Sequence, residues 1–79
     1  MKHYMYTFSE ALDAMKLGDK VRRASWSEDE EYIRIVHLPE VDGIKVNPQF
    51  FIKNKSEGYS SYSPSACEIL AEDWEIVHE

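Results

Sequence analysis

The sequence has few of the residues that build covalent cross-links, metal sites and catalytic centres. It contains one cysteine, Cys67, so an internal disulfide is impossible and a reducing compartment is expected. The three histidines and Cys67 lack metal-ligand spacings such as C-x-x-C or H-x-x-x-H. There is no G-x-S-x-G motif and no glycine-rich phosphate loop. We therefore expect a nonenzymatic protein without a metal or cofactor; a serine–histidine–acid site assembles only in space, so that alternative stays open.

Long apolar runs are absent as well. The beginning of the sequence, MKHYMYTFSE, has no apolar stretch of the kind found in a signal peptide. No other segment approaches the ~20 apolar residues that a membrane-spanning helix needs. These two absences predict a cytoplasmic protein with no membrane partner.

Basic residues are scarce. There are nine Lys and Arg against fifteen Asp and Glu, which gives a net charge of −6. Nucleic-acid affinity depends on neutralising phosphates with basic surface, so this balance argues against a DNA or RNA partner. Four of the nine basic residues nevertheless fall within eight positions: Lys16, Lys20, Arg22 and Arg23. A local patch of this kind suits a small anion better than a long polyanion.

The length bounds the architecture. Seventy-nine residues hold one domain at most, and we expect a single domain over residues 1–79. The composition, 43% hydrophobic and 30% charged, is typical of a globular protein. A chain this short buries only about 60% of its unfolded surface, and its core supplies about 3–5 kcal/mol. Self-association is therefore an expected source of further stability.

The clearest secondary-structure signal is a helix near the beginning. Thr7 and Glu10 form a capping box, in which each side chain satisfies a free backbone amide of the other residue. One apolar helical face then follows at i, i+3, i+4 and i+7: Phe8, Ala11, Leu12 and Met15. Gly18 can adopt the left-handed conformation that ends a helix.

The remaining segments favour short antiparallel strands. We expect an extended segment from Lys20 that Trp26 closes, a solvated acidic loop over 27–31, and a strand over 32–38 that Pro39 ends. Asp42-Gly43 predicts a hairpin, with strands at 44–46 and 50–53 and a weaker one at 59–63.

The end of the sequence predicts a second helical turn and a closing strand. Ser65 and Glu68 form another capping box before 66–71, and 73–77 alternates as a strand. The expected fold is therefore α+β: an N-terminal helix packed on a small antiparallel sheet, with a short second helical turn before the last strand.

Two segments at opposite ends resemble the same family. The first pattern runs phenylalanine, two residues, Ala-Leu, Lys-x-Gly and a basic residue three before a tryptophan: here Phe8, Ala11, Leu12, Lys16, Gly18, Arg23 and Trp26. The second runs serine, an acid, an apolar pair and Ala-Glu-Asp-Trp: here Ser65, Glu68, Ile69, Leu70, Ala71, Glu72, Asp73 and Trp74. The chain thus resembles the Thoeris anti-defence proteins of the second type, a family of small, mostly phage-encoded proteins.

The resemblance implies a nonenzymatic, homo-oligomeric sponge, a dimer or tetramer, in the cytoplasm of a host bacterium. Such proteins bind a cyclic nucleotide immune signal, a cyclised ADP-ribose made by bacterial Toll/interleukin-receptor domains, and hold it unhydrolysed. Some relatives hold cyclic dinucleotides, and one was first described as a Cas9 inhibitor. Relatives usually have Gly-Trp-Asn where this chain has Ser25-Trp26-Ser27, and often a tryptophan in place of Tyr62. The shortened middle matches poorly, so which cyclic nucleotide is bound stays open.

The candidate ligand-binding residues are Arg23, Trp26, Ser27, Tyr62, Ser65 and Asp73. Guanidinium groups suit diphosphate oxygens, and since strand neighbours point to opposite faces, the resemblance selects Arg23 over Arg22. The alternative is an arginine on the wet face or paired with an acid. For Asp73, acceptance from ribose hydroxyls competes with a salt bridge to an arginine.

The aromatic and hydroxyl candidates carry alternatives of their own. Trp26 could stack a purine or belong to the core, whereas Trp74 is expected in the core. Tyr62 lies in a polar stretch, which favours a stacking ring whose hydroxyl bonds a ligand. Ser27 and Ser65 could donate to phosphate, although Ser65 is first a helix N-cap.

A rival function is an acidic protein-binding inhibitor of a host defence enzyme such as a Cas nuclease. A structural phage protein without a ligand is a third possibility. Release of an intact small molecule from the denatured protein would distinguish the first reading from both.

Overall fold

The N-terminal helix lies where its capping pattern predicts it. The computed structural model describes residues 5–37 and 40–77, and α1 spans Phe8–Lys16. Thr7 is the N-cap: the Glu10 backbone amide donates to its hydroxyl at 3.2 Å, and the Thr7 amide donates to the Glu10 carboxylate at 2.9 Å. Gly18 follows the helix with a φ of 99°, a backbone conformation that glycine adopts without strain.

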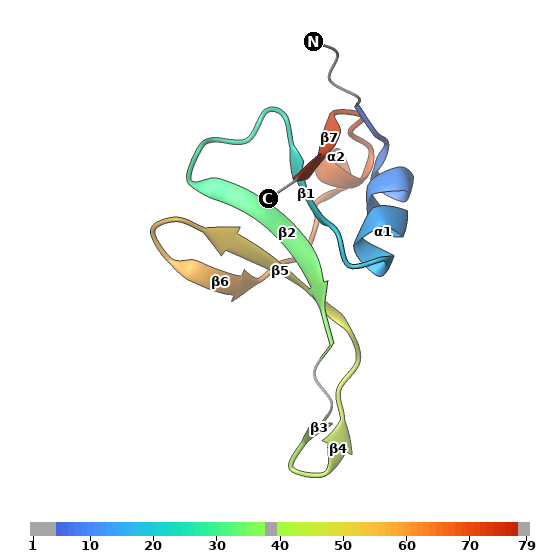
Figure 1. The fold of residues 1–79 in the computed structure, drawn as a ribbon, viewed down its shortest axis with the longest axis vertical. Coiled ribbons are helices and arrows are strands. Elements are labelled where there is room, and N and C mark those ends of the chain that lie inside the picture. The colour runs from blue at the N-terminus through green and yellow to red at the C-terminus, as the bar shows by residue number, and fades with distance from the viewer. Residues whose placement is uncertain (1–4, 38–39, 78–79) are drawn as a thin grey trace.

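A five-stranded antiparallel sheet forms the body of the protein (Figure 1). Its strand order is β6-β5-β2-β1-β7, with α2 preceding the last strand in the sequence. The bounds are β1 Lys20–Arg23, β2 Glu30–Val36, β5 Gln49–Asn54, β6 Gly58–Ser61, α2 Ala66–Ile69 and β7 Trp74–Val77. The predicted α+β class and order of elements are confirmed.

The core lies between α1 and one face of this sheet. Its buried members are Ala11, Ala14, Met15, Val21, Ile33, Ile52 and Trp74. Trp74 is fully buried, and its indole Nε1 donates to the Glu68 carbonyl at 3.0 Å. Trp74 therefore belongs to the core, as expected from its place in an alternating strand. Because β1 alternates, Val21 and Arg23 face the helix side and Arg22 faces the other side.

Several predicted boundaries are wrong; β2, for example, ends at Val36 and not at residue 38. β1 ends at Arg23, not at Trp26, because its partner β7 begins at Trp74, the residue paired with Arg23. The chain then turns, and the Trp26 amide donates to the Arg23 carbonyl at 3.1 Å. The acidic run is not a wholly solvated loop: β2 begins at Glu30, inside it.

Ion pairing and hydrogen bonds explain why the acidic run is ordered. The Lys53 ammonium lies 2.7 Å from the Glu31 carboxylate across the β2–β5 pair. The Ser56 amide donates to the Asp29 carboxylate at 2.9 Å, which ties this segment to the β5–β6 turn. Opposite charges on neighbouring strands thus draw the acidic residues into the sheet.

The predicted Asp42-Gly43 hairpin is present and projects away from the body (Figure 1). β3 spans Glu40–Val41 and β4 spans Ile44–Lys45. Asp42 and Gly43 both have positive φ, 53° and 77°, as a type I′ turn requires. Leu38 and Pro39, at the predicted end of the preceding strand, lie outside the described residues.

Candidate functional site

Strand pairing places Arg23 and Asp73 side by side at one end of the sheet. Arg23 pairs with Trp74 in the β1–β7 register, and the Ala24 amide donates to the Asp73 carbonyl at 2.9 Å. The Arg23 Nε is therefore only 2.7 Å from the Asp73 Oδ1. Both side chains remain partly exposed, at 22% and 29%. Two of the candidate residues thus form one ion pair at the protein surface.

The ion pair fixes the charge of both groups and leaves part of the arginine available. The hydrogen bond from Arg23 holds the pKa of Asp73 below its usual range, and the hydrogen bond to Asp73 raises the pKa of Arg23. Within the described residues, only the Nε of Arg23 makes a hydrogen bond. Asp73 therefore orients the guanidinium while its two Nη groups stay available to another acceptor.

Trp26 lies beside this pair, between two other aromatic rings. Its ring centroid is 6.1 Å from that of Tyr62 and 5.6 Å from that of Trp74, with interplanar angles of 70° and 75°. These are edge-to-face contacts, which orient rings more strictly than burial alone. Trp26 is only partly buried, whereas Trp74 is sealed in the core. Trp26 thus bridges the core and the surface.

Tyr62 brings a buried hydroxyl to the cluster, beside the Glu68 carboxylate. Its backbone amide donates to the Phe50 carbonyl at 2.9 Å, which fixes the residue just beyond β6. Burial raises the pKa of Tyr62, and the interaction of the hydroxyl with the Glu68 carboxylate raises it further. The hydroxyl makes no hydrogen bond of good geometry to any described residue, so Glu68 satisfies it only weakly.

Glu68 is a member of the cluster that the sequence identified as a helix cap and as part of the family pattern, but not as a candidate site residue. Burial disfavours its charged form, but interactions with Ser65 and Tyr62 outweigh burial and the pKa of Glu68 is lowered. Its charge acts on both Arg23 and Tyr62. The cluster therefore contains one cation and two carboxylates. The capping box fixes where the Glu68 carboxylate lies.

The two candidate serines are engaged in local structure. The Ser65 hydroxyl donates to Glu68 at 3.2 Å as part of the second capping box, which is present as predicted. The Ser27 hydroxyl donates to Glu30 at 3.2 Å. Ser65 thus adjoins the cluster through Glu68, whereas Ser27 lies beside Arg22, whose Nη2 donates to the Ser27 carbonyl at 3.3 Å.

The structure separates the two adjacent arginines, as strand alternation requires. Arg22 Nη2 also donates to the Trp26 carbonyl at 3.0 Å, so this side chain braces the turn that carries Trp26. Arg22 also lines a hollow of about 330 Å³ together with Glu28, Glu31, Lys55 and Val77. Its charge therefore lies on the sheet face opposite Arg23.

The described residues contain neither a metal-binding cluster nor a helix that could span a membrane. Over 5–37 and 40–77, no group of three or more His, Cys, Asp or Glu side chains is arranged to hold a metal ion. In that part of the chain, neither helix has the length and apolar character needed to cross a membrane.

These features define a small α+β protein in which an arginine–aspartate pair adjoins a row of edge-to-face aromatic rings. The class can be named more closely, because residues 6–77 match the model of the Tad2-like family, the Thoeris anti-defense 2-like domain. The chain belongs to this family, and the resemblance stated from the sequence is confirmed. A comparison with curated proteins finds no match. Membership assigns the protein to Thoeris anti-defence.

Proposed function

We propose that the protein binds a cyclic nucleotide immune signal in the cytoplasm of a bacterial host and sequesters it without chemical change. The observation that carries this proposal is the Arg23–Asp73 pair beside Trp26 and Tyr62. The ligand class is a cyclised ADP-ribose or a cyclic dinucleotide, which combines phosphates, ribose hydroxyls and planar bases. Each of these groups has a matching side chain in the cluster.

Arg23 takes the phosphate. Its Nε is held by Asp73, so the two Nη groups can donate to phosphate oxygens with little loss of side-chain freedom. The Asp73 oxygen that Arg23 does not use accepts from a ribose hydroxyl. The ion pair is therefore compatible with both roles that the sequence suggested. Arg23 can bind phosphate and Asp73 can accept from ribose while the two side chains stay paired.

Trp26 and Tyr62 take the bases. The two rings are inclined at 70°, so a base lying flat on one ring meets the edge of the other. Stacking of this kind contributes about 1–3 kcal/mol per base. The buried Tyr62 hydroxyl, which makes no hydrogen bond of good geometry among the described residues, can then bond a polar atom of the ligand.

One protomer is too small to enclose a dinucleotide. The Arg23 and Asp73 side chains are 22% and 29% exposed, so the cluster lies at the protein surface. We infer that a second copy covers the site, which makes the protein a homo-oligomer, a dimer or tetramer. Enclosure between copies also suits a sponge, which needs nanomolar dissociation constants, about 12 kcal/mol of binding free energy.

Isothermal titration with cyclised ADP-ribose and with cyclic dinucleotides tests the proposal. Arg23→Ala should weaken binding roughly 10- to 100-fold, since a hydrogen bond to a charged group is worth about 1.5–3 kcal/mol. Lys16→Ala is the matched control, because it removes one exposed cation outside the cluster. Absence of binding to every one of these ligands at micromolar protein would overturn the proposal.

A second readout separates sequestration from inhibition of a protein. Protein purified from cells that make the signal should release the intact nucleotide when it is denatured by heat. A protein-binding inhibitor would instead co-purify with its target, release no nucleotide and tolerate Arg23→Ala.

A further inference from the structure

The β3–β4 hairpin is an exposed arm without support from the body. Val41 and Ile44 are direct cross-strand partners, so their side chains lie on the same face of the arm. They are 54% and 70% exposed. Each strand has only two residues, and an isolated two-stranded hairpin is marginal in water. The arm therefore presents an apolar face with an acidic residue, Asp42, at its turn.

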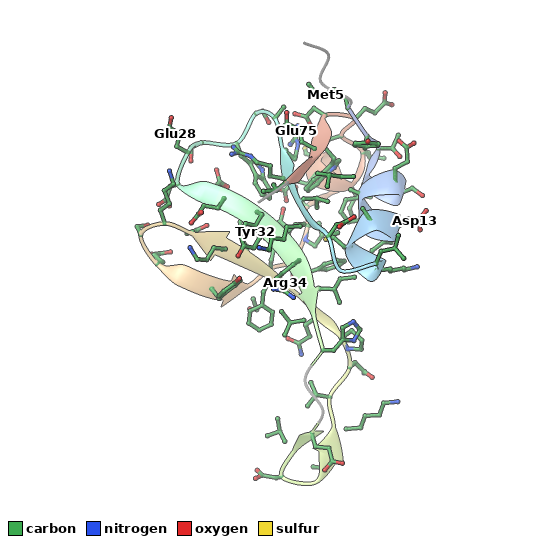
Figure 2. All side chains as sticks on the ribbon, in the orientation of Figure 1. Met5, Asp13, Glu28, Tyr32, Arg34 and Glu75 are labelled. Atoms are coloured by element: carbon green, nitrogen blue, oxygen red, sulfur yellow. The ribbon has the colours of Figure 1, made fainter. Side chains whose placement is uncertain are left out.

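A hollow of about 540 Å³ lies at the root of this arm, where β2 ends and β5 begins. It is lined by Arg34, Ile35, Val36, His37, Phe51 and Tyr59. None of these lining residues is acidic, and most of the lining side chains are apolar or aromatic. Figure 2 shows Arg34 on β2, next in line after Tyr32 on the same face of the strand.

Arg34 is a cation without a carboxylate. No acidic residue within 5–37 or 40–77 forms an ion pair with it, and its Nε is buried without a hydrogen-bond acceptor. It lies near the Tyr59 hydroxyl, whose main partner is the Tyr32 hydroxyl. An arginine fork in an apolar hollow is suited to an incoming carboxylate.

We propose that the β3–β4 arm of one copy docks in the Arg34 hollow of a second copy. Val41 and Ile44 would pack on Val36 and Phe51, and the Asp42 carboxylate would meet the Arg34 guanidinium. The arm supplies apolar side chains that match the apolar lining of the hollow and a carboxylate that the described lining lacks, and the hollow supplies the support that the arm lacks.

The arrangement closes under two-fold symmetry. Asp42, at the tip of the arm, is six residues from Val36 and eight from Arg34 in the hollow at its root, or at most about 20–29 Å of extended chain. Two arms lying antiparallel therefore bring each tip to the root of the other. An exchange of this kind uses the same two surfaces twice, as a closed dimer requires. The arm points away from its own body, so it cannot fill its own hollow (Figure 1).

This inference goes beyond the proposed function, because the surfaces that it names lie outside the Arg23 cluster, and its test needs no nucleotide. The mass of the protein is measured by light scattering after gel filtration, against 9.3 kDa for one chain. The parent protein should run as a dimer or larger, and Ile44→Asp should weaken association at least tenfold. Leu17→Asp, at an exposed apolar residue of the body, is the control and should leave the mass unchanged.

A cross-linking experiment locates the contact. In a Cys67→Ser background, a copy with Ile44→Cys is mixed with a copy with Val36→Cys and oxidised. The mixture should give a disulfide-linked dimer, whereas Lys16→Cys mixed with Val36→Cys should not. Circular dichroism confirms that each variant is folded.

Three outcomes would overturn the arm exchange. They are a monomeric parent protein at about 100 μM, an oligomer that Ile44→Asp leaves intact, and a folded Val36→Cys protein that cross-links equally with both partners. A small anion or a different protein in the hollow would appear as the first outcome. Because nucleotide binding is measured separately through Arg23→Ala, either proposal can fail while the other stands.

Discussion

Arg23 and Asp73 are fifty positions apart in the sequence and 2.7 Å apart in the fold. A partly exposed pair contributes modestly, at most about 1 kcal/mol. In the proposed function its role is orientation, because the Asp73 carboxylate holds the guanidinium at Nε and the two Nη groups make no hydrogen bond within the described residues. An arginine fixed in this way loses little freedom when it binds phosphate.

The pair predicts a pH-dependent stability. The folded-state pKa of Asp73 is lowered, so its contribution is fully present above about 3.9, the unfolded value, and disappears as the pH falls through the folded value. Asp73→Asn should therefore reduce the free energy of unfolding by up to about 1 kcal/mol at pH 7 and by progressively less below pH 4. Urea unfolding followed by circular dichroism at several pH values checks this.

Asp13→Asn is the control for this measurement. Asp13 is an exposed residue of α1 and points away from the sheet (Figure 2). Any change that Asp13→Asn makes in the free energy of unfolding should not show the decline below pH 4 that is expected for Asp73→Asn. A constant deficit of Asp73→Asn from pH 7 to pH 3 would contradict the ion-pair account.

Tyr62 predicts a larger effect on binding than on stability. Its buried hydroxyl interacts with the Glu68 carboxylate but makes no hydrogen bond of good geometry among the described residues, so Tyr62→Phe should change the free energy of unfolding by less than about 1 kcal/mol. The same substitution should weaken nucleotide binding about tenfold if the hydroxyl bonds the ligand. Denaturation and titration of one protein sample measure both. Tyr59→Phe loses the hydrogen bond to Tyr32, so it should reduce the free energy of unfolding and leave nucleotide binding unchanged.

At the residue scale, the sequence predicted which residues form the cluster better than it predicted their contacts with one another. Arg23, Trp26, Tyr62 and Asp73 are brought together, but the sequence offered the ligand roles and the ion pair as alternatives. The ion pair is present, because strand register sets Arg23 beside Asp73, and the ligand roles are the proposal made above. The charge of Glu68 was not predicted as part of the cluster. Its role as a helix cap depends on residues close in the sequence, whereas its place beside Arg23 depends on the fold.

At the element scale, local signals were the dependable ones. Both capping boxes and the Asp42-Gly43 turn form as predicted, because each depends on residues within four positions of one another. The strand ends were misplaced where a distant partner decides them. β1 stops where β7 begins, and β2 starts early because Lys53 faces Glu31. Pairing across the sheet is not encoded in the local pattern.

The two capping boxes predict a contrast between stability and function. Thr7→Ala and Ser65→Ala should each reduce the free energy of unfolding by about 1 kcal/mol, since each removes an N-cap. Only Ser65→Ala should also weaken nucleotide binding, because Ser65 holds Glu68 beside Arg23 and Tyr62. Equal binding by the two variants in titrations would show that Glu68 needs no such support.

At the scale of the whole molecule, the compact body and the projecting arm differ in how they are stabilised. The body is covered by α1 on one face and closes around Trp74. The arm extends the protein to 48 Å in its longest dimension, against 27 and 26 Å in the others. An arm of this shape contributes little to the stability of a single chain, so its apolar residues are better explained by a contact outside the chain.

Assembly through the arm predicts that thermal stability depends on protein concentration. A partner that binds only the folded chain stabilises it in proportion to the logarithm of its concentration, about 2.7 kcal/mol at one hundred times the dissociation constant. For a chain of 79 residues, each kcal/mol shifts the melting temperature by roughly 4–8 °C. Melting curves at 1 and 100 μM should therefore differ by several degrees for the parent protein. Ile44→Asp should melt at one temperature at both concentrations, whereas a parent protein with a constant melting temperature would leave the exposed Val41 and Ile44 without the proposed role.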